Sequence, residues 1–336
     1  MQIVRLDPGD DALAEACCEV TRAALATDDP LGPPVPMRIL RVELTNSVEP
    51  AHTWFVPGQT PGSAIAVCQL RLPDLEDRHR AMLYLDVHPE HRRHGIGGTL
   101  LRHAAKLAAQ DGRSVLGGEA WADTAGDMFA RHAGATPGLR DARRVLVLAT
   151  IPPGHVAALR DGATRAAGGY SLVSWTGRTP DEHLDGYAAV LEALNDGPRD
   201  PGREDRAWDA RRVRERIDVR TELYGSRAHA IGARHIATGE LAALTRVSVH
   251  PEDPELGHQL ITAVTRAHRG HRLGLLLKAA MLERLAAAEP QVKRIVTWNS
   301  ATNKHMIAIN EALGYELLEP LLQSFELRVA DILGPA

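Results

Sequence analysis

The stretch LDVHPEHRRHGIGGTLL, Leu85 to Leu101, decides the fold of this chain. An apolar strand leads into a proline turn, a basic glycine-rich loop and an amphipathic helix. Backbone N–H groups at a helix start, glycines that permit close approach and neutralising arginines together suit a pyrophosphate. A second version, TAVTRAHRGHRLGLLLK, Thr262 to Lys278, stands about half a chain length later. We therefore expect a duplicated domain.

The bulk composition is that of a globular protein. A chain of 336 residues with 44% hydrophobic and 24% charged residues can form two domains of ordinary size. Its formal net charge of −4 argues against broad nucleic-acid binding. Neither a secretion leader nor a membrane-spanning run is present, so we expect a cytoplasmic protein. Cys17, Cys18 and Cys68 are too few for a disulfide or metal framework, and no metal is expected.

The order of elements narrows the possible nucleotide sites. The first half predicts a strand, two helices, three strands, a helix, a strand, a helix and a strand. The glycine-rich stretch follows the fourth of these strands, whereas a Rossmann site would follow the first, and a Walker GK[ST] sequence is absent. Prolines and glycines then mark a boundary, which predicts domains at 1–152 and 169–336 joined by a linker at 153–168.

Val87 to Gly97, VHPEHRRHGIG, fits the pattern V-x-P-x-x-(R/Q)-x-x-G-x-(G/A). It resembles the acyl-CoA site of the GNAT superfamily of N-acyltransferases; the alternative is a glycine-rich turn with solvated arginines. The resemblance implies a mixed α/β (α+β) fold of two tandem GNAT-like domains, each a mostly antiparallel mixed sheet flanked by helices. It implies that a strand end pairs with pantetheine and that the loop wraps the pyrophosphate. The implied residues are Leu85, Val87, Arg92, Arg93, His94, Gly95, Ile96, Gly97, Gly98 and Thr99.

The second copy departs from the family pattern at one place. Arg272 stands where the first signature glycine is usual, which removes a point of backbone approach but adds a charge that could meet a phosphate. Asn303 resembles the asparagine that opens a later family motif ending here at Leu313-Gly314-Tyr315, and it also suits a simple N-cap. The residues implied in this half are Thr262, Val264, Arg269, Gly270, His271, Arg272, Leu273, Gly274, Leu275 and Asn303.

The catalytic groups are harder to predict. A strand N–H near Val264 would stabilise an oxyanion, and His258, with Glu255 close by, is the candidate base. The alternative is a bystander role, which is the more common one for a lone histidine at a strand edge. Many relatives carry a tyrosine acid four positions before the later glycine, where this chain has Asn310 and, in the first half, Ala130. We interpret Tyr84 and Asp86 as structural, and expect catalysis in the second half.

The resemblance implies an acetyl-CoA-dependent N-acetyltransferase that acetylates a primary amine of a small molecule by direct attack. Acetyl-CoA is then the cosubstrate, and a monomer or homodimer is expected. One alternative is a mycothiol-synthase-like acetylation of an amino-sugar conjugate, because that enzyme is also a tandem GNAT protein. Another is a non-catalytic CoA-binding or regulatory protein. The loops from Asp28 to Pro36 and from Asn195 to Asp205 would shape the acceptor site, and acidic residues in the second fit either a cationic acceptor or a solvated loop.

Overall fold

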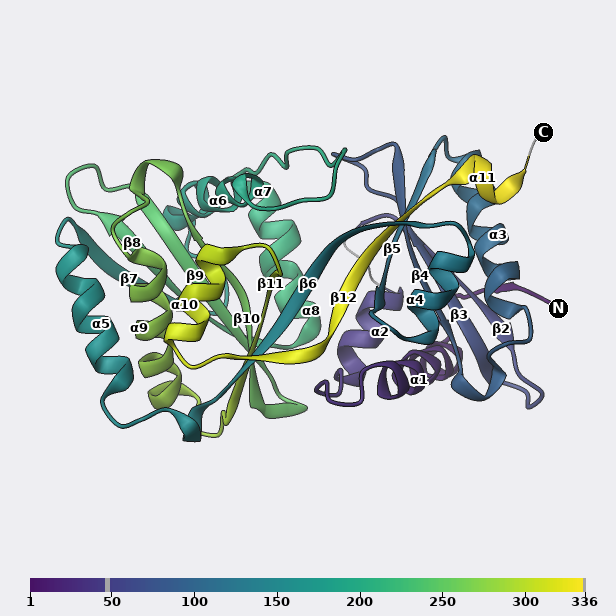
Figure 1. Ribbon diagram of the computed structural model, residues 1–336, viewed down its shortest axis with the longest axis horizontal. Helices are drawn as coiled ribbons and strands as arrows, with labels where there is room; N and C mark the ends of the chain where they lie inside the picture. Colours follow the sequence, from purple (N-terminus) through teal and green to yellow (C-terminus); the bar gives the residue numbers. More distant parts are fainter. Residues whose placement is uncertain (46–48, 335–336) are drawn as a thin grey trace. The chain divides into compact units, whose positions relative to one another are not determined.

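The structure is a computed structural model that describes residues 1–45 and 49–334. The chain forms two compact units (Figure 1). Unit 1 contains Met1–Asp141, Asp200–Glu204 and Glu319–Ala336, and unit 2 contains Ala142–Arg199 and Asp205–Leu318. None of the helices in the described part of the chain combines the length and apolar character needed to span a bilayer.

Unit 1 is built on a mixed sheet with the strand order β1-β2-β3-β4-β5-β12. Only β4 and β5 pair in parallel among these neighbours. The strands are β1 (Val4–Arg5), β2 (Ala51–Pro57), β3 (Ala64–Arg71), β4 (Arg80–Val87), β5 (Val115–Trp121) and β12 (Glu316–Arg328). The helices are α1 (Asp11–Asp28), α2 (Met37–Thr45), η1 (Pro89–His91), α3 (Ile96–Gln110), α4 (Ala125–His132) and α11 (Val329–Leu333).

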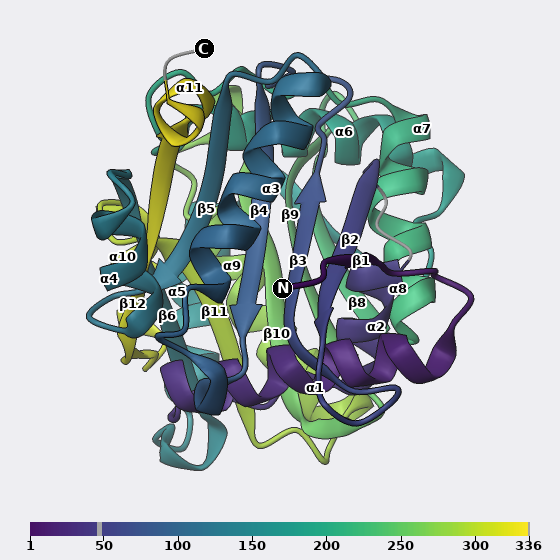
Figure 2. The ribbon, with the colours of Figure 1, turned by 90° about the vertical axis from the view of Figure 1, so that its right-hand side faces the viewer.

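Strand alternation places the unit 1 sheet between two helices. Trp54 and Val56 of β2 belong to the core beneath α3, whereas Phe55 between them packs with α1. Figure 2 shows α3 lying across one face of these strands. The α1 helix is capped by Asp10, whose side chain accepts a hydrogen bond from the Leu13 N–H at 3.0 Å. Both faces of the sheet are therefore covered, and the β4–α3 turn lies at its end.

Unit 2 repeats this plan with the strand order β6-β11-β10-β9-β8-β7. Its strands are β6 (Thr136–Val147), β7 (Tyr170–Thr176), β8 (Arg227–His235), β9 (Leu241–His250), β10 (Asp253–Val264) and β11 (Arg294–Ser300), with β10 and β11 parallel. Its α-helices are α5 (His155–Ala166), α6 (Leu184–Glu192), α7 (Ala210–Val213), α8 (Val219–Tyr224), α9 (Leu273–Ala288) and α10 (Lys304–Ala312). Short helical turns are η2 (Leu148–Thr150), η3 (Asp181–His183), η4 (Ala193–Asp196), the π-helical η5 (Arg214–Asp218) and η6 (Arg266–His268).

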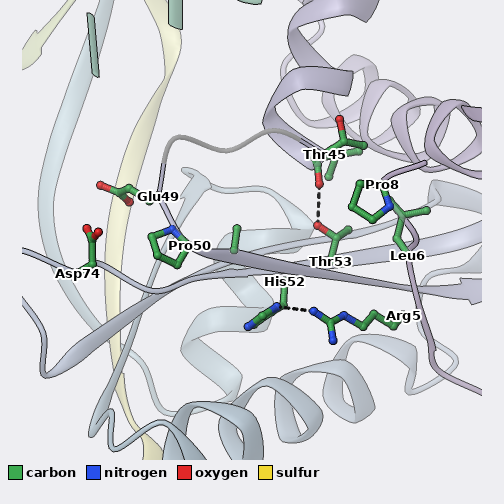
Figure 3. A pocket seen from close by; sticks show the side chains of 11 residues that line it. Arg5, Leu6, Pro8, Thr45, Glu49, Pro50, His52, Thr53 and Asp74 are labelled. Carbon is green, nitrogen blue, oxygen red and sulfur yellow. Dashed lines mark hydrogen bonds between the residues drawn. The ribbon is translucent and has the colours of Figure 1, made fainter. Parts of the chain in front are cut away.

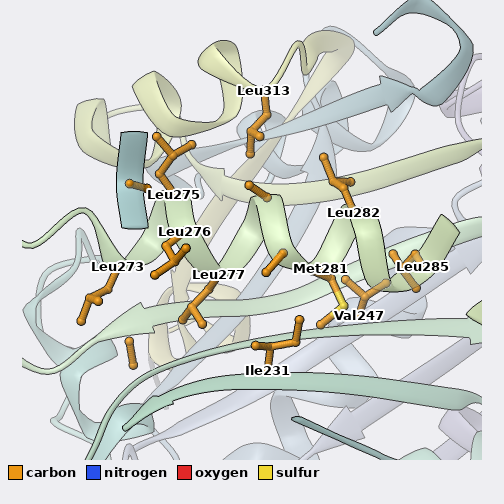
Figure 4. Close-up of a cluster of buried hydrophobic side chains, with 14 of the residues drawn as sticks. Ile231, Val247, Leu273, Leu275, Leu276, Leu277, Met281, Leu282, Leu285 and Leu313 are labelled. Carbon is orange, nitrogen blue, oxygen red and sulfur yellow. The ribbon is translucent and has the colours of Figure 1, made fainter. Parts of the chain in front are cut away.

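The α9 helix is the centre of the unit 2 core. Figure 4 shows Leu277 and Met281 directed toward the sheet side chains Ile231 and Val247, and Leu282 directed away from the sheet with Leu313. A helix that is apolar nearly all round must be covered on all sides, which here is achieved by the sheet, α5 and α10.

The compact units differ from the predicted contiguous domains at 1–152 and 169–336. Unit 1 takes β12 from the end of the chain, where residues Leu322 to Arg328 pair with β5 and Phe325 is buried. Unit 2 takes the end of β6, which buries Leu146 in its core, and the predicted linker at 153–168 contains α5. Pairing between segments far apart in sequence leaves no local pattern from which the domain boundaries could be predicted. The pairing of β12 with β5 also covers what would otherwise be an exposed sheet edge.

Candidate functional site

A wedge opens between the two parallel strands of unit 1. β4 pairs with β5 only from Arg80 to Met82, opposite Val115 to Gly117. Beyond that point β5 pairs with β12, so residues 83–87 of β4 have no partner strand on that side in the described structure. Peptide N–H and C=O groups along such an edge are strong hydrogen-bonding groups that require partners. The wedge thus offers backbone hydrogen bonds to an extended ligand that carries amides.

The loop after β4 forms an anion cradle, which we call cradle 1 (residues 92–99). Arg93 and Gly95 adopt left-handed conformations, with φ of 67° and 76°, and Gly95 is the N-cap of α3. The first helical hydrogen bond runs from the Thr99 N–H to the Gly95 carbonyl at 3.1 Å. The preceding N–H groups at the helix start have no helical acceptor and suit a phosphate.

A cavity of about 410 Å³ lies against cradle 1. It brings together most of the residues predicted for the first half, while His94 and Thr99 instead contact loop carbonyls at 3.3 and 3.1 Å. The Phe129 ring from α4 forms another wall, and a Cβ atom added at Gly97 would stand 3.3 Å from it. Its lining residues are Asp28, Leu85, Asp86, Val87, His91, Arg92, Arg93, Gly95, Ile96, Gly97, Gly98, Ala125, Gly126, Phe129 and His132.

The signature arginine of cradle 1 binds protein groups. Arg92 Nε donates to the Val87 carbonyl at 3.1 Å, and its two terminal nitrogens donate to the Asp28 carboxylate at 2.7 and 2.9 Å. Arg92 therefore positions the loop against the end of α1. Arg93 is exposed and has no ion-pair partner among residues 1–45 and 49–334, so its charge is available to a phosphate. Asp28, predicted to lie in an acceptor loop, instead holds Arg92, a role that no local sequence signal indicates.

Unit 2 contains the same construction, cradle 2 (residues 269–275). β10 pairs with β11 from Leu256 to Gln259 and then diverges, which opens a second wedge. Arg269 Nε donates to the Val264 carbonyl at 3.3 Å, and Nη2 donates to Asp196 at 2.7 Å. Each signature arginine thus joins the strand end to an aspartate at the start of a predicted acceptor loop.

Each cradle has two residues in the left-handed conformation, an arginine and a glycine, and their order along the chain is opposite in the two cradles. Arg93-His94-Gly95 in cradle 1 corresponds to Gly270-His271-Arg272 in cradle 2. Gly270 and Arg272 have φ of 89° and 56°, so the loop keeps the conformation seen in cradle 1 although the glycine is missing. A non-glycine residue in this conformation costs about 1–2 kcal/mol. Each cradle therefore has one left-handed glycine and one left-handed arginine.

Comparison with known proteins agrees with this geometry. The model of the Acetyltransferase (GNAT) family matches residues 22–134. A solved tandem GNAT protein from the clavulanic acid biosynthesis pathway is 31% identical, with a TM-score of 0.79 over 100% of this chain and 99% of that chain. The chain belongs to the GNAT acetyltransferase family.

A second solved structure shares the fold of this tandem GNAT protein. The GCN5-related N-acetyltransferase from Sphaerobacter thermophilus is 14% identical, with a TM-score of 0.68 over 98% of this chain and 95% of that chain. No curated protein matches the chain. The predicted tandem GNAT resemblance and the mixed α/β fold class are confirmed.

The other residues predicted for the site in unit 2 have mostly structural surroundings. Leu273 and Leu275 are buried in the α9 core, and a Cβ atom at Gly274 would lie 3.2 Å from Ile309. Thr262 shares a hydrogen bond of 2.8 Å with Thr245. His271 is exposed. Asn303 caps α10, where its side chain accepts from the Met306 N–H at 3.1 Å, so the N-cap role predicted for it is present.

His258 lies at the closed end of the second wedge. It pairs with Val296 of β11 and stands two residues before Leu260, where the β10–β11 pairing has ended. Burial lowers its pKa, which favours the neutral imidazole that a base requires. Glu255, expected close by, instead pairs with Lys293 at 2.5 Å. The role of His258 as base stays a prediction.

Asn310 belongs to a buried polar network and not to an open site. Its amide oxygen accepts a hydrogen bond from Lys278 Nζ at 2.5 Å, and its amide nitrogen donates to Asn299 at 3.2 Å. The Lys278 ammonium also lies 4.6 Å from the centre of the Tyr315 ring. Burial lowers the pKa of Lys278 to about 7. The position usual for a tyrosine acid thus carries a side chain that is engaged within the fold.

Unit 1 has titratable groups that sequence analysis did not assign to the site. Asp86 lines the cradle 1 cavity, accepts a hydrogen bond from Thr21 Oγ1 at 2.8 Å, and burial raises its pKa to about 6. His132 of α4 lines the same cavity. His132 could have been predicted for the site only from the position of α4 after β5, the strand that borders the wedge. That position is known only once the fold is known.

The acidic residues of the predicted second acceptor loop contact protein groups. Asp200 accepts from the Leu139 N–H at 2.6 Å, and Glu204 accepts from the Asp77 N–H at 2.9 Å. Asp196 is held by Arg266 and Arg269, and the hydrogen bond from Arg266 is the main reason that its pKa is lowered. These contacts give the carboxylates structural roles.

Another cavity of about 410 Å³ in unit 1 lies apart from cradle 1 (Figure 3). Arg5 and His52 approach each other at its edge, with 2.9 Å between Arg5 Nη2 and His52 Nδ1. Thr53 Oγ1 donates to the Leu44 carbonyl at 2.9 Å. None of the cradle 1 residues lines this cavity, so it is separate from the cavity beside cradle 1.

Proposed function

We propose that the protein moves an acetyl group from acetyl-CoA to the primary amine of a small molecule. The observation that carries the proposal is the wedge with an adjoining cradle. In this arrangement the pyrophosphate binds the helix-start N–H groups, and pantetheine pairs with the open edge of β4 or β10. The acyl group then lies toward the closed end of the wedge.

Direct attack requires a base, oxyanion stabilisation and a proton for the departing thiolate. The base takes a proton from the acceptor ammonium, and a strand N–H on the open edge of β10 stabilises the tetrahedral oxyanion. His258 is the base we propose in unit 2, because it lies at the closed end of that wedge and its pKa is lowered. Water supplies the proton to the thiolate, since the Asn310 amide has no acidic proton to give.

We assign turnover to unit 2 and acyl-CoA binding to unit 1. A specific observation favours a second candidate, turnover in unit 1: Asp86, with a pKa of about 6, lines the cradle 1 cavity and could act as a base. The 31% identical relative comes from the clavulanic acid biosynthesis pathway, which supports a small-molecule acceptor. Cytoplasmic acetyl-CoA would supply the reaction.

The test measures thiol release from acetyl-CoA with a panel of small amines that includes amino-sugar conjugates. Convergent initial-rate lines are expected for direct attack, whereas parallel lines would indicate a covalent acyl-enzyme. Tight CoA binding with no thiol release for any amine would favour the non-catalytic alternative.

A matched pair of variants distinguishes the two units. Gly97→Val and Gly274→Val place similar bulk in the first turn of α3 and of α9, where added Cβ atoms meet Phe129 at 3.3 Å and Ile309 at 3.2 Å. We expect Gly274→Val to abolish turnover and Gly97→Val to preserve most of it. The reverse result would move catalysis to unit 1. Circular dichroism checks that both variants fold.

A further inference from the structure

Three potential metal ligands converge at the rim of unit 2, beside cradle 2. They are His235 at the end of β8, Glu240 just before β9, and His268 in η6. One donor atom from each lies within 4.8 Å of the other two. His268 Nε2 and a Glu240 carboxylate oxygen are 3.6 Å apart. Two imidazoles and a carboxylate form a donor set typical of zinc sites.

Supporting hydrogen bonds orient both imidazoles. The Thr238 hydroxyl donates a hydrogen bond to the Glu240 carboxylate at 3.0 Å. Because its one proton is used there, the same hydroxyl accepts from His235 Nδ1–H, also at 3.0 Å. The other ring nitrogen of His235, Nε2, therefore keeps its lone pair. His268 Nδ1 lies 2.9 Å from the Tyr170 hydroxyl, and this contact turns Nε2 toward Glu240. Metal-bound histidines in proteins nearly always have such a partner on the other ring nitrogen.

The backbone fixes these positions independently of the side chains. His235 and Glu240 close the β8–β9 hairpin, where the His235 N–H donates to the Glu240 carbonyl at 2.8 Å. Gly239, between them, has a φ of 78°, which suits this tight turn. The His268 N–H donates to the Thr265 carbonyl at 3.0 Å. A cavity of about 430 Å³ borders Glu240 and His268 and gives an ion access.

We propose that His235, Glu240 and His268 bind a divalent transition metal, with zinc as the reference ion. Donors around tetrahedral zinc are about 3.3 Å apart, given bonds of about 2.0–2.1 Å. The distance of 3.6 Å between His268 Nε2 and the Glu240 carboxylate is already near that separation. The longest distance between two donor atoms, 4.8 Å, would have to shorten by about 1–2 Å. The Glu240 side chain is 66% exposed and free to make this movement. Imidazole ligands disfavour magnesium and calcium.

A simple ion pair between His268 and Glu240 is the alternative. It explains one contact, but it does not explain why a ring nitrogen of His235 also lies within 4.8 Å of both donors. A metal would leave a fourth coordination position open toward the cavity. It would also hold η6 in place, and η6 directly precedes Arg269, which positions cradle 2. This inference goes beyond the acetyl-transfer proposal and does not depend on it.

The experiment titrates Zn²⁺ into untagged, chelator-treated full-length protein by calorimetry. We expect one ion per chain with a Kd in the micromolar range or tighter, and visible absorption bands of tetrahedral Co²⁺ when cobalt replaces zinc. At 100-fold excess over Kd, Zn²⁺ should raise the thermal midpoint of unit 2 by about 5–10 °C. The cysteines do not compete, because burial raises the pKa of their thiols to about 11 or 12.

Variants separate this site from adventitious binding. Glu240→Gln, at an exposed position, and His268→Ala should each weaken binding at least tenfold, and Tyr170→Phe should weaken it about tenfold through loss of the supporting hydrogen bond. His271→Ala is the matched control, because its ring lies 5.4 Å from that of Tyr170 but outside the ligand set.

Three results would each overturn the proposal. They are a Kd no tighter than millimolar, unchanged Zn²⁺ affinity in Glu240→Gln, or an equal loss in His271→Ala. If His268→Ala fails to fold, Glu240→Gln and the cobalt spectrum decide the question.

Discussion

Replacement of Arg272 by glycine tests the correspondence between the two cradles. Arg272 adopts φ 56° and ψ 22° as the N-cap of α9. Release of a non-glycine residue from this conformation is worth about 1–2 kcal/mol, and the added freedom of glycine in the unfolded chain costs about 0.5–1 kcal/mol. We therefore expect Arg272→Gly to stabilise unit 2 by up to about 1 kcal/mol. Its thermal midpoint should rise by about 2–4 °C in differential scanning calorimetry.

The same substitution should weaken CoA binding at cradle 2. Arg272 is exposed and has no ion-pair partner in the described part of the chain, so its charge is free to meet a phosphate. A charge-assisted contact at an exposed position is worth about 1 kcal/mol, which corresponds to a roughly fivefold rise in Kd. Titration calorimetry with CoA measures this change. Stability and affinity should thus move in opposite directions.

Two control variants sharpen this test. Arg272→Lys keeps both the charge and the left-handed conformation, so its midpoint should stay unchanged and most of its CoA affinity should remain. Gly95→Ala makes the converse change in unit 1, where the added Cβ meets no atom within 4 Å, so only the backbone cost of about 1 kcal/mol is expected. A lower midpoint in Arg272→Gly, or an unchanged Kd for CoA at cradle 2, would refute the reasoning.

Three further predictions concern charged groups. Asp28→Asn should cost unit 1 about 2 kcal/mol in urea denaturation, since it removes the carboxylate that binds Arg92; an unchanged midpoint would contradict this. Hydrogen bonding from Arg227 lowers the pKa of Glu289 to about 2. The ionised Glu289 therefore stabilises the folded protein by roughly 3 kcal/mol above pH 4.5, and this contribution is lost as the pH falls toward 2. The difference in unfolding free energy between wild type and Glu289→Gln should close over that range. Burial lowers the folded-state pKa of Lys278 from 10.5 to about 7. Between pH 6 and 9 the unfolding free energy of the wild type should therefore rise by roughly 3 kcal/mol relative to that of Lys278→Met. A difference that stays constant over this range would refute a titrating Lys278.

Local structure follows from the sequence wherever a few neighbouring residues determine it. The strand that leads into the glycine-rich loop is β4, the amphipathic helix that follows is α3, and Asn303 is an N-cap, because each depends on a few neighbouring residues. The sequence did not predict β12 as the edge strand of unit 1 or β6 as part of unit 2, because such pairing joins distant segments. The ion pair between Glu255 and Lys293 likewise joins two strands that are far apart in sequence.

The sequence by itself determined that the chain has two glycine-containing helix starts suited to an anion. Their glycines, helix starts and basic residues act through the backbone within a dozen positions, so the motif contains its own geometry. Only the tertiary structure decided which charges are free, because Asp28 and Asp196 approach Arg92 and Arg269 from distant helices. It also brought His268 to the β8–β9 hairpin. Charge pairing and ligand convergence depend on distances in space, which the fold sets after the local motifs have formed.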